Sequence, residues 1–239
     1  NVIYLYTNDP VSQNSFVGAA RDKGYDVLVM DGQLDTHFIG WFENKNQGTR
    51  FVRVDADVVD KLIEKENNLK MALSSAQQDL LRPVFEAQLP AEDKIRYTVS
   101  FEPMAENQMP VMITQNEFMR RMKDMAAMGG SGMQFYGQLP DNFNVVINGN
   151  HPLVAEILGE VEASYGDKLK TTNKKLDAAI AEQRSFEELV KDKKAEDFSQ
   201  EEKDKQQEVD KKVEDLRRQR TERLTEIGRE NKLVKQVVD

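Results

Sequence analysis

Few residues of this chain have the type and spacing that suit catalysis or metal binding. The 239 residues include two histidines, His37 and His151, and no cysteine. Neither histidine has a second histidine at ligand spacing, so surface or helix-capping roles are expected for both. Asp31 and Asp35 flank a turn and a helix start, where aspartate is favoured for its backbone contacts. We therefore predict no catalytic residue and no metal site.

A glycine-rich run at residues 129–132 invites comparison with a phosphate-binding loop. It follows a predicted helix instead of a strand, and no Lys-Ser or Lys-Thr pair comes after it. The strand–helix–strand pattern at the start of the chain also lacks a G-x-G-x-x-G turn. A nucleotide-binding enzyme remains an alternative, but no cofactor is predicted for this chain.

Methionine is the distinctive residue type. Eight of the ten methionines lie within residues 104–133, and several share one face of a predicted amphipathic helix. Such a face either packs into the chain's own core or forms an exposed, adaptable surface, because methionine is unbranched and polarisable. The apolar candidates on and beside this helix are Phe118, Met119, Met122, Met125, Met128, Met133 and Phe135.

The overall charge and the hydrophobic pattern exclude some partners. Thirty-three basic and 42 acidic residues give a net charge of −9, which disfavours nucleic-acid binding because phosphates require clustered Lys and Arg. No apolar run approaches the ~20 residues needed to cross a bilayer, and no signal peptide opens the chain. We expect a cytoplasmic protein with no membrane partner. The chain opens directly on a strand, so we expect it to begin inside a domain.

Apolar runs at residues 2–6, 27–30 and 51–54 alternate with helical segments. This order predicts a short parallel sheet covered by helices. Residues 55–85 have helical periodicity and are expected to connect two domains.

A second group of short strands is predicted at residues 95–101, 111–114 and 143–148. They fit a small antiparallel sheet with helices, so the fold class is α+β. Thr114 and Glu117 have the spacing of a capping box at the start of the methionine-rich helix. A further helix is predicted to open after Asn150 and to end near residue 165.

Charged residues make up about half of the positions beyond residue 160. Narrow apolar stripes there predict several helices folded as an antiparallel hairpin. Ser185 with Glu188, and Ser199 with Glu202, are read as two more capping boxes. The stripes consist of Leu169, Leu176, Ile180, Val209, Val213, Leu216, Leu224 and Ile227. This hairpin is either a solvated arm or a coiled-coil surface for a partner protein.

Three stretches resemble the 90-kDa heat-shock chaperone family in its bacterial form. Residues 23–31 (KGYDVLVMD) with the following Gln33-Leu34-Asp35 resemble the end of its middle domain. Residues 116–130 (NEFMRRMKDMAAMGG) and 147–153 (INGNHPL) resemble its C-terminal domain. The resemblance implies a middle-domain end over residues 1–70 and a dimerisation and client-binding domain over 71–239, with a charged helical insertion at about 166–230.

The resemblance also implies a function. The family folds client proteins in an ATP-driven clamp, and its ATP and Mg²⁺ site lies in an N-terminal domain that this sequence does not contain. Unfolded client proteins and a second protomer are therefore the expected partners. The family motif places client contacts on Phe118, Met122 and Met125. Dimerisation is expected at the end of the chain, through Leu233, Val234, Val237 and Val238.

Overall fold

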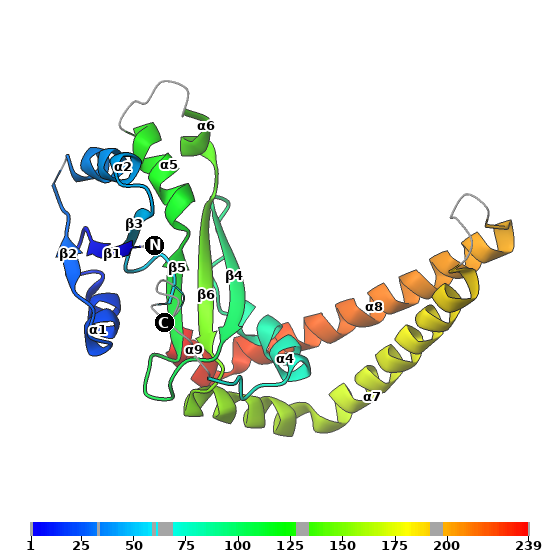
Figure 1. Ribbon diagram of the computed structural model, residues 1–239. Helices are drawn as coiled ribbons and strands as arrows, with labels where there is room; N and C mark the ends of the chain where they lie inside the picture. The colour runs from blue at the N-terminus through cyan, green and yellow to red at the C-terminus, as the bar shows by residue number, and fades with distance from the viewer. Residues whose placement is uncertain are drawn as a thin grey trace. The chain divides into compact units, whose positions relative to one another are not determined.

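The computed structural model describes residues 2–32, 34–58, 61, 69–127, 134–191 and 198–238. The chain forms two compact units (Figure 1). The first comprises Asn1–Ser74 and Leu89–Val154, and the second comprises Ser75–Gln88 and Ala155–Asp239. Helices and two small sheets make up the structure, which confirms the predicted α+β class. No helix within the described ranges combines the length and the apolar character needed to cross a bilayer.

The first sheet is parallel, as predicted. Its strands are β1 (Val2–Thr7), β2 (Val27–Val29) and β3 (Thr49–Arg53), in the order β2-β1-β3. Helices α1 (Asn14–Asp22) and α2 (Asp35–Lys45) connect these strands. Side chains of the sheet alternate between two cores: Leu5 and Val52 pack with Val17 of α1, whereas Tyr6 and Phe51 pack with Ile39 of α2.

Local chemistry fixes the ends of α1. The carboxylate of Asp9 accepts hydrogen bonds from the backbone amides of Val11 and Ser12, both at 3.1 Å, although the helix itself begins a turn later. Gly24, just after the helix, has a φ of 78°, a left-handed conformation that glycine adopts without steric cost.

The second sheet is mixed, which corrects the antiparallel prediction. Strand β6 (Asp141–Asn148) lies between β4 (Ile95–Glu102) and β5 (Val111–Gln115). It pairs with β4 in parallel and with β5 in antiparallel orientation. Residues 145–147 of β6 are buried on both faces of the sheet, and such a fully apolar run favours the central position. Helices α5 (Glu117–Ala127) and α6 (Gln134–Gln138) lie in the connection from β5 to β6.

The helical prediction for residues 55–85 is wrong at residues 69–74, which have no helical structure. Hydrogen bonds from its backbone to the side chain of Asn150 hold this segment in an irregular conformation. The Asn150 side chain accepts from the amide of Ala72 at 2.8 Å and donates to the carbonyl of Lys70 at 3.1 Å. The apolar spacing here reflects burial of Leu73 in an irregular segment instead of a helix face.

The second unit is helical and consists of α4 (Ser75–Glu86), α7 (Pro152–Val190), α8 (Gln200–Glu230) and α9 (Lys232–Val238). His151 caps α7, since its Nδ1 accepts from the amide of Leu153 at 3.1 Å. The predicted end of this helix near residue 165 is wrong, because α7 is 39 residues long and continues to Val190. Residues 166–190 are rich in Lys, Ala, Glu and Leu, which are strong helix formers and carry the helix onward. The higher density of charged residues there therefore does not mark the end of a helix.

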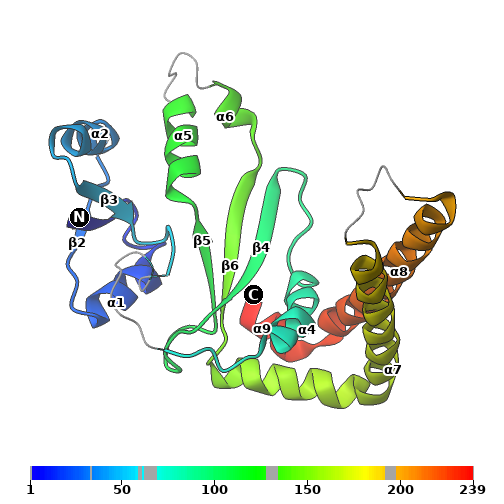
Figure 2. The same ribbon diagram turned by 45° about the vertical axis from the view of Figure 1, so that its right-hand side comes forward.

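Helices α7 and α8 form the predicted antiparallel hairpin (Figures 1 and 2). The predicted apolar stripes meet between them, where Leu176, Ala179 and Val213 form a buried cluster. The capping box at Ser199 and Glu202 is confirmed in both directions. The one predicted at Ser185 is wrong, because Ser185 lies inside α7 and its hydroxyl donates to the carbonyl of Ala181 at 2.8 Å.

Candidate functional site

Helix α5, which carries the methionines, has its charged side turned toward the protein. Its N-terminus is capped by Asn116, which accepts from the amide of Met119 at 3.2 Å. The capping box predicted from Thr114 and Glu117 is wrong, since Thr114 is a buried residue of β5 and Glu117 has other partners. The helix is therefore oriented by tertiary contacts of Glu117 and its neighbours.

Glu117 is a buried carboxylate that accepts from three side chains. The donors are the Tyr6 hydroxyl at 3.0 Å, Arg120 Nη2 at 2.8 Å and Arg121 Nε at 2.6 Å. Arg120 also donates to the Tyr6 hydroxyl at 2.6 Å. A buried charge is tolerated only when it is paired and hydrogen-bonded, and this network meets both conditions.

Arg121 extends the network to the first sheet and α2. Its guanidinium donates to Glu43 at 2.9 Å and to the carbonyl oxygen of Phe51 at 2.7 Å. One turn along, Lys123 forms an ion pair with Asp141 at 2.6 Å. The charged residues on this side of α5 thus anchor the helix to the first sheet, to α2 and to β6.

The network also sets the ionisation of its members. Burial acts to raise the pKa of Glu117, but the charges of Arg120 and Arg121 outweigh it and hold that pKa below its usual value. Burial and then the charge of Glu117 raise the pKa of Tyr6. Glu117 is therefore ionised and Tyr6 neutral at neutral pH, as the donor and acceptor pattern requires.

The other side of α5 is apolar and partly open to water. Phe118 is 58% exposed, and Phe135 on α6 is 68% exposed. Met119, Met122 and Met125 are half-buried, so none of them belongs to the fully buried core. Met128 and Met133 lie outside the described residues. The structure thus places two predicted aromatic residues in solvent and three predicted methionines at the boundary.

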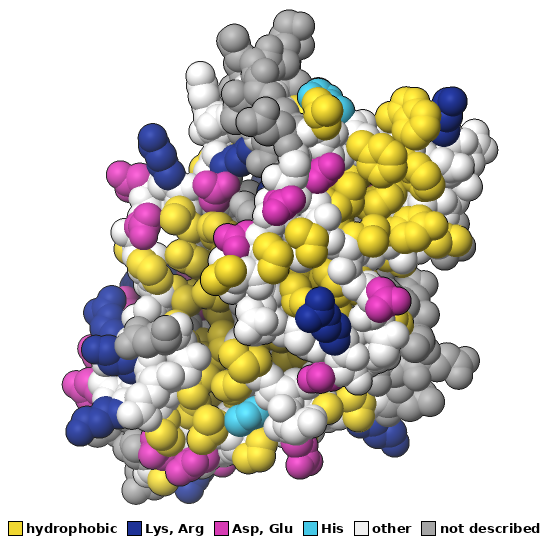
Figure 3. All heavy atoms as spheres, turned by 90° about the vertical axis from the view of Figure 1, so that its left-hand side faces the viewer, with side chains coloured by type: hydrophobic (Ala, Val, Ile, Leu, Met, Phe, Trp, Pro, Cys, Tyr) yellow, Lys and Arg dark blue, Asp and Glu magenta, His cyan; other side chains and the backbone are white. Residues whose placement is uncertain are grey.

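An aromatic cluster near α2 was not identified from the sequence. Phe42 of α2 contacts Tyr4 and Phe51 of the sheet, and Phe38 contacts Phe51. Trp41 contacts Phe38 and Phe42 within the helix, and ring centroids across the cluster are 5.1–6.5 Å apart. Trp41 is 53% exposed. Figure 3 shows hydrophobic side chains gathered in the upper part of this face, at the level of α2. Three aromatic residues at i, i+3 and i+4 in a short helix were the signal available in the sequence.

The predicted dimerisation residues lie on α9. Val234 is fully buried within the second unit, while Leu233, Val237 and Val238 are half-buried. A dimerisation role for the four remains a prediction.

The residues weighed for catalysis have structural surroundings. His37 is exposed, and His151 is the cap of α7. Asp35 accepts from the amide of Gly32 at 2.8 Å, as its position at a turn suggested. Within the described part of the chain, no group of three or more His, Cys, Asp or Glu side chains is placed to hold a metal ion. The glycine run at 129–132 falls outside the described residues.

Exposed apolar side chains on two neighbouring helices, α5 and α6, are typical of surfaces that bind other polypeptides. No family model matches the chain. The chain is 39% identical over 239 residues to the chaperone protein HtpG of Bacteroides thetaiotaomicron and 40% identical over 239 residues to that of Bacteroides fragilis. It is 38% identical over 238 residues to chaperone protein HtpG of Porphyromonas gingivalis.

The chain therefore belongs to the 90-kDa heat-shock chaperone family, which confirms the resemblance. Each match covers 100% of the chain and 35% of the relative, so the chain spans about a third of the length of these relatives. The matches include the charged hairpin at 166–230, so these relatives share that part of the chain.

Proposed function

We propose that this chain is part of an ATP-dependent chaperone and binds apolar segments of unfolded client proteins through the apolar side of α5. One observation carries the proposal. The ion pairs of Glu117, Arg120 and Arg121 hold the charged side of the helix against the protein, so the apolar side with Phe118 is the one left outside.

The side chains on this surface suit clients of varied sequence. Methionine can repack against many apolar partners, because it is unbranched and has three rotatable bonds. Burying each large apolar side chain contributes up to ~1.5–3 kcal/mol before the entropy losses of binding. Phe118 and Phe135 have the most area left to bury, so they are expected to be the main anchors.

The remaining parts of the chaperone cycle are proposed from family membership. ATP and Mg²⁺ would bind in a part of the longer, cytoplasmic protein that this sequence does not include. The apolar residues of α9 would contribute to a homodimer. The curated relatives are named as chaperones, and this supports the role of the longer protein.

The test replaces Phe118 and Met122 together by glutamate and measures suppression of the aggregation of reduced insulin. Loss of two apolar contacts should weaken suppression by about tenfold or more, because ~1.4 kcal/mol corresponds to a factor of ten. The control is Val11→Glu, which changes a valine that is 86% exposed in a turn. Unchanged suppression in the double variant would refute the proposal, and a large fall in Tm would place these side chains in the core.

A further inference from the structure

Sulfur is confined to methionine in this chain, and the methionines differ in how far they are open to water. The sequence has no cysteine, so an oxidant can modify sulfur only at methionine. Met104 is 2% exposed and Met112 is 9% exposed, and both belong to a core cluster. Met109 is 53% exposed, and the three described methionines of α5 are half-buried. Oxidants dissolved in water therefore reach some of these sulfur atoms and are kept from others.

Oxidation of a methionine replaces an apolar side chain by a polar one. The thioether sulfur attacks one oxygen of hydrogen peroxide, and the O–O bond breaks. The other oxygen leaves as hydroxide and takes the proton of the transferred oxygen to become water. The sulfur is oxidised by two electrons, and the peroxide is reduced. The sulfoxide oxygen is a hydrogen-bond acceptor, and its burial against an apolar client without a donor is unfavourable.

Helix α5 can be oxidised on its apolar side without being released from the protein. Its charged side is held by the ion pairs of Arg120 and Arg121 with Glu117, and by that of Lys123 with Asp141. None of these contacts involves a sulfur atom. A sulfoxide on the apolar side therefore changes the surface offered to clients and leaves the anchoring contacts in place.

We propose that Met119, Met122 and Met125 form an oxidation site that switches off client binding on the apolar side of α5. The inference rests on the proposed client-binding function, because it names how that surface is regulated. Peroxide converts the three thioethers to sulfoxides, and the modified surface binds clients about tenfold more weakly. A methionine sulfoxide reductase reverses the change: two thiols become a disulfide, the sulfoxide returns to the thioether, and water is released.

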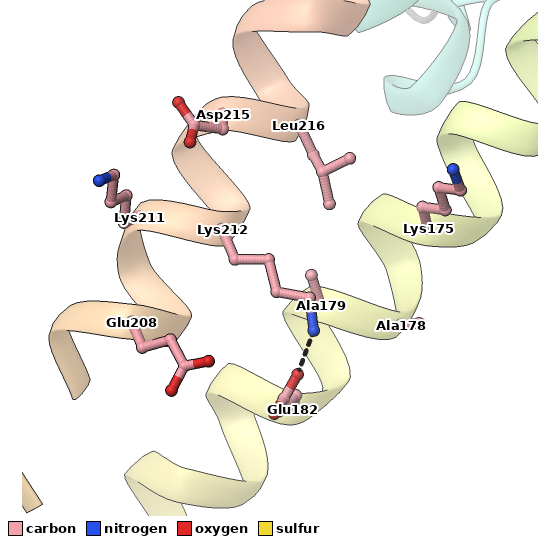
Figure 4. A pocket seen from close by; sticks show the side chains of 9 residues that line it. All are labelled: Lys175, Ala178, Ala179, Glu182, Glu208, Lys211, Lys212, Asp215 and Leu216. Atoms are coloured by element: carbon pink, nitrogen blue, oxygen red, sulfur yellow. Dashed lines mark hydrogen bonds and ion pairs between the residues drawn. The ribbon is translucent and has the colours of Figure 1, made fainter. Parts of the chain in front are cut away.

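The α7–α8 hairpin has no part in this chemistry, because the chain has no methionine beyond Met133. Figure 4 shows a hollow between these two helices, with a volume of about 610 Å³. Charged residues line it together with Ala178, Ala179 and Leu216. A partner bound to the hairpin would make contacts that peroxide leaves unchanged. Sensitivity to peroxide therefore distinguishes binding at α5 from binding at the hairpin.

The order of oxidation tests access to the sulfur atoms. The 239-residue chain is treated with hydrogen peroxide, catalase removes the excess, and peptide mass spectrometry measures the fraction of each methionine that has gained an oxygen atom. Met109 should react first, the methionines of α5 next, and Met104 and Met112 last. The Tm should stay the same while α5 is oxidised, because its ion pairs remain. Unreactive α5 methionines, or a large fall in Tm when they react, would overturn the proposal.

Suppression of insulin aggregation tests the switch. Each protein is compared with itself before and after peroxide, so its starting level of suppression does not enter. The wild type should lose suppression about tenfold, and a methionine sulfoxide reductase with dithiothreitol should restore it. Leucine at Met119, Met122 and Met125 together, which is apolar and lacks sulfur, should abolish the effect of peroxide. Met109→Leu, which changes a more exposed methionine at the other end of β5, should leave the effect as large as in the wild type.

A second triple variant separates the switch from the client-binding proposal. Glutamine resembles methionine sulfoxide in size and polarity, so glutamine at the same three positions should reduce suppression about tenfold without peroxide. Full suppression by a wild type whose α5 methionines are oxidised would overturn the switch, even where the variant with Phe118→Glu and Met122→Glu shows that clients bind there. A loss that persists in the leucine variant would also overturn it. Unchanged suppression in the glutamate variant would instead remove the client-binding proposal itself.

Discussion

Glu117 determines which side of α5 faces water, and it does so through partners that are themselves buried. Arg120 is 9% exposed and Glu117 is 8% exposed, so neither charge can turn to solvent without moving the helix. Removing one partner of a buried ion pair leaves the other charge unpaired, which is costlier than never having buried the pair.

Glu117→Gln should lower the free energy of unfolding by about 3 kcal/mol, in the range measured for broken buried pairs. The glutamine can still accept hydrogen bonds, but it leaves Arg120 and Arg121 without their shared counter-charge. Denaturant unfolding followed by circular dichroism measures the change. Glu106→Gln, at an exposed position, should change stability by no more than ~0.5 kcal/mol.

The difference between wild type and Glu117→Gln should depend on pH in one direction. The pKa of Glu117 is lowered below the ordinary value of 4.5, so its contribution is complete above about that pH. It is lost as the pH falls through the folded-state pKa, because the folded carboxylate then becomes protonated. Unfolding curves between neutral and acidic pH should therefore converge, and a gap that widened toward low pH would contradict the lowered pKa.

Gly228 is required by the packing of α8 against α4. A Cβ atom at this position would lie 2.8 Å from the Cβ of Ala87 and would also collide with the carbonyl oxygen of Val84. Gly228→Ala should therefore destabilise the protein by about 1–3 kcal/mol, since the backbone of α4 must move. Gly159→Ala is the matched control, because nothing lies within 4 Å of that Cβ. It should stabilise α7 by up to ~1 kcal/mol in the same melting experiment.

At the scale of elements, sequence patterns predicted most helices and strands but not their ends. The three Ser/Thr–Glu spacings look alike, yet only Ser199 forms a capping box. Ser185 is surrounded by strong helix formers that carry α7 through it, and Thr114 is held in β5 by pairing with Asn144. A capping motif therefore has an effect only where a helix begins at that residue. At Thr114 strand pairing prevents a helix start, and at Ser185 the helix is already formed.

Ser199→Ala should destabilise the hairpin by about 1 kcal/mol, because the amide of Glu202 loses its hydroxyl acceptor. Ser185→Ala should leave stability the same or slightly higher, since alanine has the higher helix propensity. Thermal melts of the two variants, measured side by side, separate a true cap from an internal serine. Equal losses in both would mean that the capping box at Ser199 contributes nothing.

At the scale of the whole molecule, the candidate site depends on contacts between distant parts of the sequence. Tyr6 and Glu117 are separated by 111 residues, and Tyr6 and Arg120 by 114. Periodicity identified the apolar side of α5, but it could not show that the charged side is the one bound to the protein. The aromatic cluster of α2 was missed for a related reason, because it forms through contacts of α2 with Tyr4 and Phe51, which lie on two other elements of the fold.

The outer part of the α7–α8 hairpin, residues 173–218, should be dispensable for the fold of both units. Residues 173–218 of α7 and α8 pack against each other, whereas α4 contacts the remaining part of α8 through Gly228 and its neighbours. Residues 172 and 219 lie at nearly the same level of the antiparallel hairpin, and packed helices are ~8–10 Å apart. A four-residue Gly-Ser linker can span that distance. The shortened protein should keep its Phe118-dependent suppression of insulin aggregation and the hydrogen-exchange protection of β4–β6. Loss of hydrogen-exchange protection in β6 would show instead that residues 173–218 support the sheet.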